Sequence, residues 1–459
     1  MVINSISDFQ KVFFIGIAGT GMSAIAQYLQ GTGKEVSGSD RYFHENEENT
    51  VKKQLEAEGI ACFLQNGDGL NETIDLVVVS TAIEDTVPEV QKAKKLNIPI
   101  IKRSELLATI AKSKKTIAVA GTSGKSTTSA MLYQILLDAG KEPSIIAGAG
   151  LTSLIKKGKI GNAAVGEGDW LIIEADESDG SIVQYHPEIG LLLNVDKDHQ
   201  EIDELMVLFK KFKENTKGLF IVNQSNMLAE TLSASNQQDF GFEAPKAGFN
   251  VTNFRQNGFK VEFSIGSQNF LMTILGRHNV ENAAAAVAVA VQIGISLQSC
   301  AESLKHYEGI YRRHQILGEK NGILVIDDYA HNPAKCAASI SACQPLSQKL
   351  IAWFQPHGYG PTRFLRQDFV DEIADALRPQ DEIWMSEIYY AGGTAVKDIS
   401  ANDLINDLKK KGKNAKFVSN RNDLVFELKS SQSKEYTLLL MGARDPSLEG
   451  FAHQVFSQL

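Results

Sequence analysis

The chain has 459 residues, of which 43% are hydrophobic and 22% charged, and this composition is ordinary for a folded protein. At roughly 150 residues per domain, the length predicts about three domains. The formal net charge is −9 and no long basic block occurs, which argues against a nucleic-acid partner. No apolar run reaches the ~20 residues that a membrane span needs, so we expect no membrane insertion.

Cysteine usage and the first residues predict a cytoplasmic protein. Cys62, Cys300, Cys336 and Cys343 are scattered and form no closely spaced pair, which favours reduced thiols over disulfides or a zinc site. The opening residues contain neither the basic stretch nor the apolar stretch of a secretory signal.

Short apolar runs alternate with helical patterns over the first part of the chain. The runs at 12–17, 35–37 and 76–80 read as strands, and the periodic segment 22–29 reads as a helix. Such alternation predicts a parallel sheet covered by helices.

Two further α/β segments follow, each after a polar joint. After residues 111–115 we expect strands at 116–120, 171–174 and 190–195, and the turn signals Asn257-Gly258 and Gly266-Ser267 predict an appended antiparallel meander within 249–275. A helical pattern resumes at Asn279. After a joint near 309–313, strands are expected at 323–326, 349–354, 382–385 and 437–441. The predicted fold class is therefore α/β with three domains.

The first motif is a glycine-rich turn, Gly16-Ile-Ala-Gly19-Thr-Gly21, between a strand and a helix. Glycines there let the backbone approach a pyrophosphate at the helix N-terminus. Asp40 lies about where an acidic side chain would meet a ribose or base. The alternative is tight strand–helix packing, and the glycine order GxxGxG differs from the GxGxxG of NAD sites.

The second motif, residues 121–128, reads Gly-Thr-Ser-Gly-Lys-Ser-Thr-Thr and directly follows an apolar strand. It keeps the Gly-Lys-Ser core of a phosphate loop but is shorter than the usual pattern, since Val119 stands where the first glycine would be. Backbone N–H groups can surround phosphates, Lys125 can neutralise their oxygens, and the Ser126 hydroxyl can bind Mg²⁺.

Motifs rich in acidic residues stand at the ends of the next two predicted strands. Glu174 begins the run Glu-Ala-Asp-Glu-Ser-Asp, and His199 closes Asn-Val-Asp-Lys-Asp-His. Mg²⁺ prefers carboxylate oxygens together with phosphate and water, so Glu174 is a candidate ligand and His199 a candidate for a second metal. The alternative for Glu174 is an acidic solvated loop, and the alternative for His199 is a satisfied surface or core residue.

Three clusters later in the chain are candidates for nucleotide contacts. Asn279 and Asn282 are three residues apart and share one helix face, where two amides can read a purine edge; alternatively, Asn279 caps the helix. Arg312-Arg313 and the run 327–333 (Asp-Asp-Tyr-Ala-His-Asn-Pro) flank the joint before the third domain.

Taken in order, these motifs resemble the Mur ligases of peptidoglycan synthesis over nearly the whole chain. The segments that carry the resemblance are GIAGTGMS, SGSD, VSTAI, GTSGKSTT, EADESD, NVDKDH, GRHNVENAAAA, YRRH, DDYAHNP and FQPH. The resemblance implies an N-terminal Rossmann-like UDP-sugar-binding domain at 1–107, a central ATP-binding domain at 108–315 and a C-terminal Rossmann-like, amino-acid-binding domain at 316–459.

The resemblance also implies the roles of particular residues. The UDP-sugar would be bound by Gly16, Ala18, Gly19, Thr20, Gly21, Met22, Asp40, Ser80, Thr81 and Ala82. ATP would be bound by Gly121, Thr122, Ser123, Gly124, Lys125, Ser126, Thr127, His278, Asn279, Asn282, Arg313 and Asp328. The metal ligands would be Ser126, Glu174 and His199, and the catalytic residues Lys125, Glu174, His199 and Arg313. The amino acid would meet His331, His357, Tyr359, Arg363 and Arg444.

The activity implied is an ATP- and Mg²⁺-dependent amide ligation. An amino acid, with L-alanine favoured, would be joined to the lactyl carboxylate of UDP-N-acetylmuramate through an acyl phosphate. The partners would be these small molecules, and the protein would be a monomer or weak dimer.

The chain departs from this pattern at several positions, which concentrate near those that would determine the choice of substrate. Ser123 stands where a His is usual, and Ala18 stands where a Gly is usual. The segment after FQPH reads Gly358-Tyr-Gly-Pro-Thr-Arg363, and the usual Gly-Ala-Gly-Asp near the end reads Gly442-Ala-Arg-Asp445. Arg363 or Arg444 could therefore hold the α-carboxylate by a bidentate contact, or be a surface arginine.

Three alternatives remain open from the sequence. A recycling ligase would attach a murein tripeptide or another amine to the same nucleotide sugar. An NAD-dependent oxidoreductase would explain the first glycine turn but not the phosphate loop with Glu174 and His199. A Mur-like protein could also bind nucleotide without catalysis, although Lys125, Ser126, Glu174 and His199 are all present.

Overall fold

The structure, a computed structural model, describes residues 3–45, 48–80, 83–196, 201–390, 396–430 and 435–459. The chain forms two compact units. The first comprises Met1–Thr252, Ser264–Phe270 and Glu281–Ile310, and the second Asn253–Phe263, Leu271–Val280 and Tyr311–Leu459.

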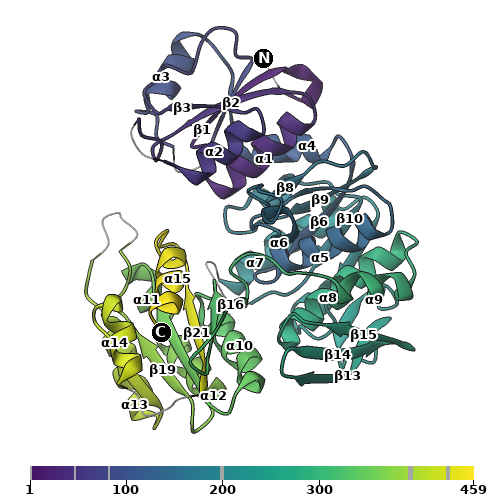
Figure 1. Ribbon diagram of the computed structural model, residues 1–459. Helices are drawn as coiled ribbons and strands as arrows, with labels where there is room; N and C mark the ends of the chain where they lie inside the picture. Colours follow the sequence, from purple (N-terminus) through teal and green to yellow (C-terminus); the bar gives the residue numbers. More distant parts are fainter. Residues whose placement is uncertain (1–2, 46–47, 81–82, 197–200, 391–395, 431–434) are drawn as a thin grey trace. The chain divides into compact units, whose positions relative to one another are not determined.

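The first unit begins with a five-stranded parallel sheet in the order β3-β2-β1-β4-β5 (Figure 1). Its strands are β1 (Lys11–Ile15), β2 (Glu35–Asp40), β3 (Ala61–Leu64), β4 (Leu76–Val79) and β5 (Ile100–Lys102). Its helices are α1 (Thr20–Gly31), α2 (Thr50–Ala57), α3 (Pro88–Lys95) and α4 (Arg103–Ala111). The predicted strands at 12–17, 35–37 and 76–80 and the predicted helix at 22–29 are confirmed.

Alternating side chains of β1 explain how this sheet is covered on both faces. Val12 and Phe14 pack in the cluster that includes α1 and α4, whereas Phe13 and Ile15 pack in the cluster that includes α3. Successive strand residues point to opposite faces, so a run of buried apolar residues requires cover on both sides.

A second sheet in the first unit has six strands in the order β11-β10-β6-β9-β7-β8. Its strands are β6 (Lys115–Ala120), β7 (Ser144–Ile146), β8 (Ala163–Ala164), β9 (Trp170–Glu174), β10 (Ile189–Leu192) and β11 (Leu219–Val222). The short edge strand β8 is antiparallel to β7, and the other pairs are parallel. The helices are α5 (Lys125–Asp138), α6 (Thr152–Ile155) and α7 (Ile202–Asn215).

A four-stranded sheet in the order β12-β13-β14-β15 comes next along the chain. Its strands are β12 (Phe240–Phe242), β13 (Phe249–Asn257), β14 (Lys260–Ile265) and β15 (Gln268–Met272). Residues 258–259 and 266–267 form the turns that join the last three strands, which is the geometry of successive antiparallel hairpins. The helices α8 (Arg277–Gln292) and α9 (Leu297–Lys305) follow.

The C-terminal part of the second unit is a six-stranded sheet in the order β16-β17-β21-β18-β19-β20. Its strands are β16 (Gln315–Lys320), β17 (Ile323–Asp328), β18 (Leu350–Gln355), β19 (Glu382–Met385), β20 (Asn414–Phe417) and β21 (Tyr436–Gly442). β16 is antiparallel to β17, and the other four pairs of this sheet are parallel. The helices are α10 (Pro333–Cys343), α11 (Tyr359–Phe364), α12 (Arg366–Ala376), α13 (Ala401–Lys410), α14 (Leu424–Lys429) and α15 (Leu448–Gln458).

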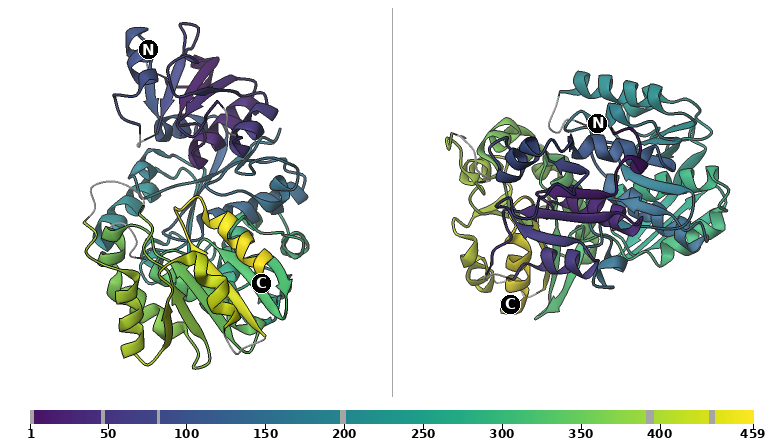
Figure 2. Two further views of the ribbon diagram at one scale, coloured as in Figure 1. Left: turned by 60° about the vertical axis from the view of Figure 1, so that its left-hand side comes forward. Right: turned by 90° about the horizontal axis from the view of Figure 1, so that it is seen from above.

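Helices cover both faces of this sheet, as the sequence of β18 requires. Leu350, Ala352 and Phe354 pack with α10, α12 and α13, whereas Ile351 and Trp353 pack with α14 and α15. In the left view of Figure 2, α15 lies in front of the strands. The four strands predicted for this region are confirmed. No helix among the described residues is long and apolar enough to cross a membrane.

Candidate active site

The phosphate loop connects β6 to α5 at the carboxyl edge of the central sheet. Gly124 precedes α5 with a φ of 86°, in the left-handed region that favours glycine. A Cβ at this position would lie 2.3 Å from Asn282 Oδ1, so the loop also needs glycine for lack of space. The backbone N–H groups at the start of α5 suit a phosphate ligand.

Lys125 lies between the loop and two carboxylates. Its Nζ is 2.8 Å from the Gly121 carbonyl oxygen, 2.7 Å from Glu177 Oε2 and 3.7 Å from Asp176 Oδ1. Burial by itself lowers the pKa of Lys125, but Glu177 and Asp176 outweigh it and keep the pKa above its ordinary value. The ammonium therefore stays charged at neutral pH, as a phosphate-binding lysine must.

Ser126 and Glu174, the candidate metal ligands within the described residues, lie next to each other beside this lysine. Glu174 ends β9, and its Oε2 accepts a hydrogen bond from the Ser126 hydroxyl at 3.0 Å, while its Oε1 accepts one from the Gly148 N–H at 2.5 Å. Burial raises the pKa of Glu174, and these two hydrogen bonds oppose the rise. His199 lies outside the described residues. Within the described residues, no three His, Cys, Asp or Glu side chains gather as metal ligands.

Asn194, just after the end of the neighbouring strand β10, holds the phosphate loop in shape. Its Oδ1 accepts from the Ser123 N–H at 2.9 Å and from the Thr122 hydroxyl at 2.9 Å, and its Nδ2 donates to the Ser123 carbonyl at 3.1 Å. Asn194 and Glu177 both stand inside motifs that are recognisable in the sequence, but the local pattern predicts no role for either residue.

The candidate adenine residues begin α8. Asn282 is buried next to Gly124, and Asn279 donates its Nδ2 to the Leu275 carbonyl at 2.7 Å. The helix starts at Arg277, so Asn279 lies inside it and is not the capping residue. The His278 ring lies 5.4 Å from that of His314, and burial lowers the pKa of His278 to about 3.

The glycine turn of the N-terminal sheet adopts the conformation that its glycines predict. Gly16 has a φ of 82°, and α1 begins at Thr20 after the N-cap Gly19. Asp40 is buried, and its two oxygens accept the N–H groups of Ala18 at 2.9 Å and Tyr42 at 3.0 Å, so it fixes the shape of this turn. Its contact with a ribose stays a prediction. Ser80 directly follows β4, and Thr81 and Ala82 lie outside the described residues.

In the second unit, Asp328 is buried at the end of β17. It accepts the N–H groups of Ala330 at 2.7 Å and His314 at 3.1 Å. Arg313 is half-buried, with its guanidinium carbon 5.1 Å from the centre of the Tyr329 ring. The adjacent Arg312 instead pairs with Asp327 through both carboxylate oxygens.

Two of the amino-acid candidates, His331 and His357, lie beside each other. The rings of His331 and His357 are 5.6 Å apart, and Tyr359 faces Tyr390 at 6.3 Å. Arg363 forms an ion pair with Asp398, which offers it a surface partner. Arg444 has a φ of 66° in the loop after β21.

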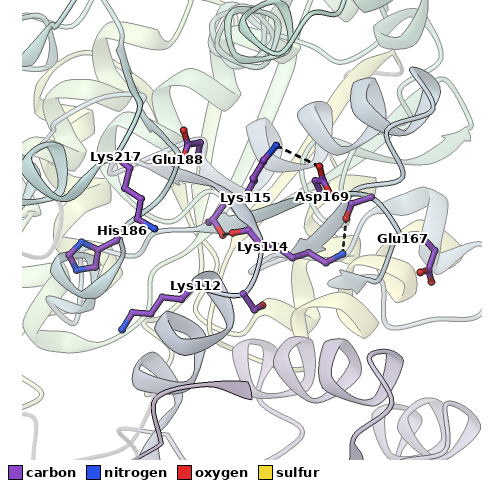
Figure 3. Close-up of a pocket in the computed structure, with 11 residues that line it drawn as sticks. Lys112, Lys114, Lys115, Glu167, Asp169, His186, Glu188 and Lys217 are labelled. Carbon is purple, nitrogen blue, oxygen red and sulfur yellow. Dashed lines mark hydrogen bonds and ion pairs between the residues drawn. The ribbon is translucent and has the colours of Figure 1, made fainter. Parts of the chain in front are cut away.

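A cavity of about 490 Å³ lies in the first unit at the opposite end of the central sheet (Figure 3). It is lined by residues before and at the starts of β6, β9, β10 and β11. Lys114 donates to the carbonyls of Gly166 and Gly168 at 2.8 Å, and Lys115 pairs with Asp169 at 3.6 Å. These lysines therefore hold the joint before the central domain, and the cavity does not belong to the phosphate site.

Three segments of the chain match successive domains of one family. Residues 11–115 match the Mur ligase family, catalytic domain; residues 119–290 match the Mur ligase middle domain; and residues 312–444 match the Mur ligase, glutamate ligase domain.

Relatives match over almost their whole length. The chain is 36% identical over 456 residues to the UDP-N-acetylmuramate–L-alanine ligase of Carboxydothermus hydrogenoformans, covering 96% of this chain and 95% of that protein. It is 35% identical over 453 residues to the enzyme of the same name from Geobacter sp., with 95% of each covered.

Solved structures agree with the fold. The UDP-N-acetylmuramate–alanine ligase of Thermotoga maritima superposes with a TM-score of 0.78 at 26% identity, covering 98% of this chain and all of that one (100%). A murein peptide ligase from Psychrobacter arcticus gives a TM-score of 0.67 at 20% identity with 98% of each chain covered, a likeness of fold alone.

The fold, the phosphate loop and its neighbouring carboxylate define an ATP-dependent ligase. The three consecutive matches show which one: the chain belongs to the Mur ligase family.

Proposed function

We propose that this chain joins L-alanine to the lactyl carboxylate of UDP-N-acetylmuramate with cleavage of ATP to ADP and phosphate, in the synthesis of peptidoglycan precursors. The observation that carries the proposal is the meeting of Lys125, Ser126 and Glu174 at the phosphate loop, in a chain 36% identical to a ligase of that name.

The reaction has two steps. An oxygen of the lactyl carboxylate attacks the γ-phosphorus of ATP, and the bond between this phosphorus and the β-phosphate oxygen breaks. ADP departs, and the carboxylate has become an acyl phosphate. The amine of alanine then attacks the acyl carbon, the bond from carbon to the phosphate oxygen breaks with release of inorganic phosphate, and the amine gives a proton to solvent as the amide forms. The first step brings anions together, and the Lys125 ammonium and the Arg313 guanidinium would offset their repulsion.

Mg²⁺ fits the donors that the loop offers. The Ser126 hydroxyl and the Glu174 carboxylate are hard oxygen ligands next to each other, and Mg²⁺ usually takes one or two carboxylates and completes its shell with phosphate and water. When bound, the ion would neutralise charge on the phosphate oxygens. Glu174 would then act as a carboxylate, with His199 as the proposed ligand of a second ion.

The remaining roles are proposals of the same kind. The turn 16–22, Asp40 and residues 80–82 would bind the UDP-sugar, and His278, Asn279 and Asn282 would lie at the adenine. In the second unit, Asp328 would meet the ribose, and the proposed amino-acid contacts are His331, His357, Tyr359, Arg363 and Arg444. We propose the boundaries 1–107, 108–315 and 316–459 for the three domains, and action in the cytoplasm as a monomer or weak dimer.

The test is a phosphate-release assay with purified protein, ATP, Mg²⁺ and UDP-N-acetylmuramate, to which amino acids and the murein tripeptide are added one at a time. Release with L-alanine, and a product heavier by one alanyl residue in mass spectrometry, is the expected result. Release with the tripeptide but not with L-alanine would move the substrate assignment to a recycling ligase. No release with any acceptor would contradict the proposed activity.

A further inference from the structure

Arg103 lies at the edge of the N-terminal sheet where the glycine turn is found. It is the first residue of α4 and directly follows β5, while the glycine turn directly follows β1. Both strands belong to one parallel sheet, so their carboxyl ends share an edge. Ligands of such sheets bind outside that edge.

The guanidinium packs directly against the glycine turn. A Cβ added to Gly21 would lie 3.2 Å from Cδ and 3.2 Å from a terminal nitrogen of Arg103. Gly21 belongs to the first turn of α1, beside the segment expected to approach the diphosphate of the nucleotide sugar. A fixed cation therefore lies in contact with the backbone that would hold an anion.

The second partner of Arg103 comes from the acidic motif of the central sheet. One terminal nitrogen is 3.3 Å from Asp179 Oδ2, and the two side chains are 25% and 24% exposed. The other oxygen of Asp179 accepts the Ser181 N–H at 2.9 Å, which holds the carboxylate in place. Among the described residues, this rather long contact uses one of the five N–H donors of the guanidinium, so the side chain is oriented and has further donors to offer a ligand.

The acidic motif also faces Lys125, through Asp176 and Glu177. One short segment of the chain, residues 174–179, thus contacts a cation on the side of the glycine turn and a cation on the side of the phosphate loop. The reaction requires the nucleotide sugar to extend from the first of these places toward the second. Arg103 lies at the beginning of that path.

We propose that Arg103 is a substrate-binding residue that donates hydrogen bonds to an anionic group of the nucleotide sugar, with Asp179 holding its guanidinium in position. The proposal rests on the proposed function. Two groups of UDP-N-acetylmuramate have the required chemistry, the diphosphate and the lactyl carboxylate. UDP-N-acetylglucosamine carries the first and lacks the second, so comparing the two ligands separates them.

The experiment measures binding of both nucleotide sugars by calorimetry, and steady-state KM values, for the wild type and Arg103→Ala, Arg103→Lys, Asp179→Asn and Lys159→Ala. We expect Arg103→Ala to weaken the binding of UDP-N-acetylmuramate by about ten- to a hundredfold, because a charge-assisted contact is lost. The KM for ATP should be unchanged. Arg103→Lys keeps the charge without the planar fork, so its affinity for UDP-N-acetylmuramate should lie between those of the wild type and Arg103→Ala. This variant provides the test if the alanine variant does not fold.

Lys159→Ala is the matched control. Lys159 pairs with Glu58 at 3.8 Å, another ion pair between the N-terminal and central parts of the first unit, away from the glycine turn. It should leave substrate binding unchanged. If Arg103→Ala weakens the binding of both nucleotide sugars equally, the result supports a contact with the diphosphate. If it weakens the binding of UDP-N-acetylmuramate alone, the result supports a contact with the lactyl carboxylate.

Two results would overturn the role of Arg103. One is wild-type affinity of Arg103→Ala and Arg103→Lys for both sugars. The other is an equal rise in the KM values for UDP-N-acetylmuramate and ATP in Arg103→Ala, because the loss would then be general and not specific to the nucleotide sugar. A wild-type protein that binds neither sugar would instead refute the proposed function itself, which keeps the two failures distinguishable.

Discussion

Lys125 contacts the phosphate loop on one side and carboxylates on the other. Mutation can separate its role in the reaction from its role in stability. We expect Lys125→Ala to lower the ligation rate by about a hundredfold or more, because a charge that stabilises the transition state is lost. Stability should fall by about 1–3 kcal/mol, since the Glu177 side chain, 6% exposed, loses the ammonium 2.7 Å away.

The double variant Lys125→Ala/Glu177→Gln tests this division. It removes the charge that Lys125 neutralises, so the free energy of unfolding in urea should recover while phosphate release stays low. A double variant as unstable as Lys125→Ala would show that Glu177 is not the source of the loss.

At the residue scale, the sequence predicts side chains whose roles follow from a local pattern. Lys125 and Ser126 are recognisable because the glycines beside them define a phosphate loop. The roles of Glu177, Asn194 and Arg103 depend on partners 52, 71 and 76 residues away, so no local spacing reveals them. What could have been noticed is that Glu177 and Asn194 stand inside motifs already singled out.

At the element scale, Asn162 joins the start of α1 to the central sheet. Its Nδ2 donates to the Thr20 carbonyl at 2.8 Å and to Ser23 Oγ at 3.0 Å, and its Oδ1 accepts from Gln27 Nε2 at 2.7 Å. Asn162 is fully buried. Asn162→Ala should therefore cost about 1–3 kcal/mol of stability, because buried polar groups on α1 lose their partner.

The same substitution should raise the KM for UDP-N-acetylmuramate more than the KM for ATP, because α1 begins at the turn proposed to bind the nucleotide sugar. Urea unfolding and steady-state kinetics measure the two effects. The control is Asn414→Ala, which removes an exposed amide that donates to the Pro379 carbonyl at 2.9 Å. If Asn162→Ala changed stability and KM no more than Asn414→Ala does, α1 would not depend on this contact.

The elements that the sequence predicts are those with a long apolar run. β1, β6, β9 and β18 are buried on both faces and show as continuous apolar stretches. β7 has three residues and β8 has two, too few for a run or a period to be visible. These short strands nevertheless matter, because β8 follows directly after Asn162.

At the scale of the whole molecule, the three alternating segments in the sequence predict three domains, which the three successive domain matches confirm, and the structure divides into two compact units. The reason lies in the core. One cluster of buried residues contains Phe14 and Leu29 of the N-terminal part together with Ala118 and Ile173 of the central sheet. Sequence periodicity indicates how many sheets form, but it does not reveal that two of them share apolar packing. The boundaries at 107 and 315 stay predictions.

The second unit contains two histidines that make its stability depend on pH. Burial, reinforced by neighbouring cations, lowers the pKa of His331 to about 3, and burial, reinforced by His314, does the same for His278. Unfolding returns each to its ordinary value of 6.5, so between pH 6.5 and about 3 the unfolded state binds more protons. Their contribution to stability is complete above pH 6.5 and is lost as the pH falls toward 3.

We therefore expect the second unit to lose up to about 1.4 kcal/mol per pH unit for each histidine in this window. Trp353 and Trp384 are buried in this unit, and Trp170 belongs to the first, so tryptophan fluorescence of a Trp170→Phe variant reports the second unit alone. Urea midpoints measured by this fluorescence should fall between pH 7 and pH 4.5, and adding His331→Gln should flatten the fall. A midpoint independent of pH in this range would mean that these histidines are not held neutral by burial.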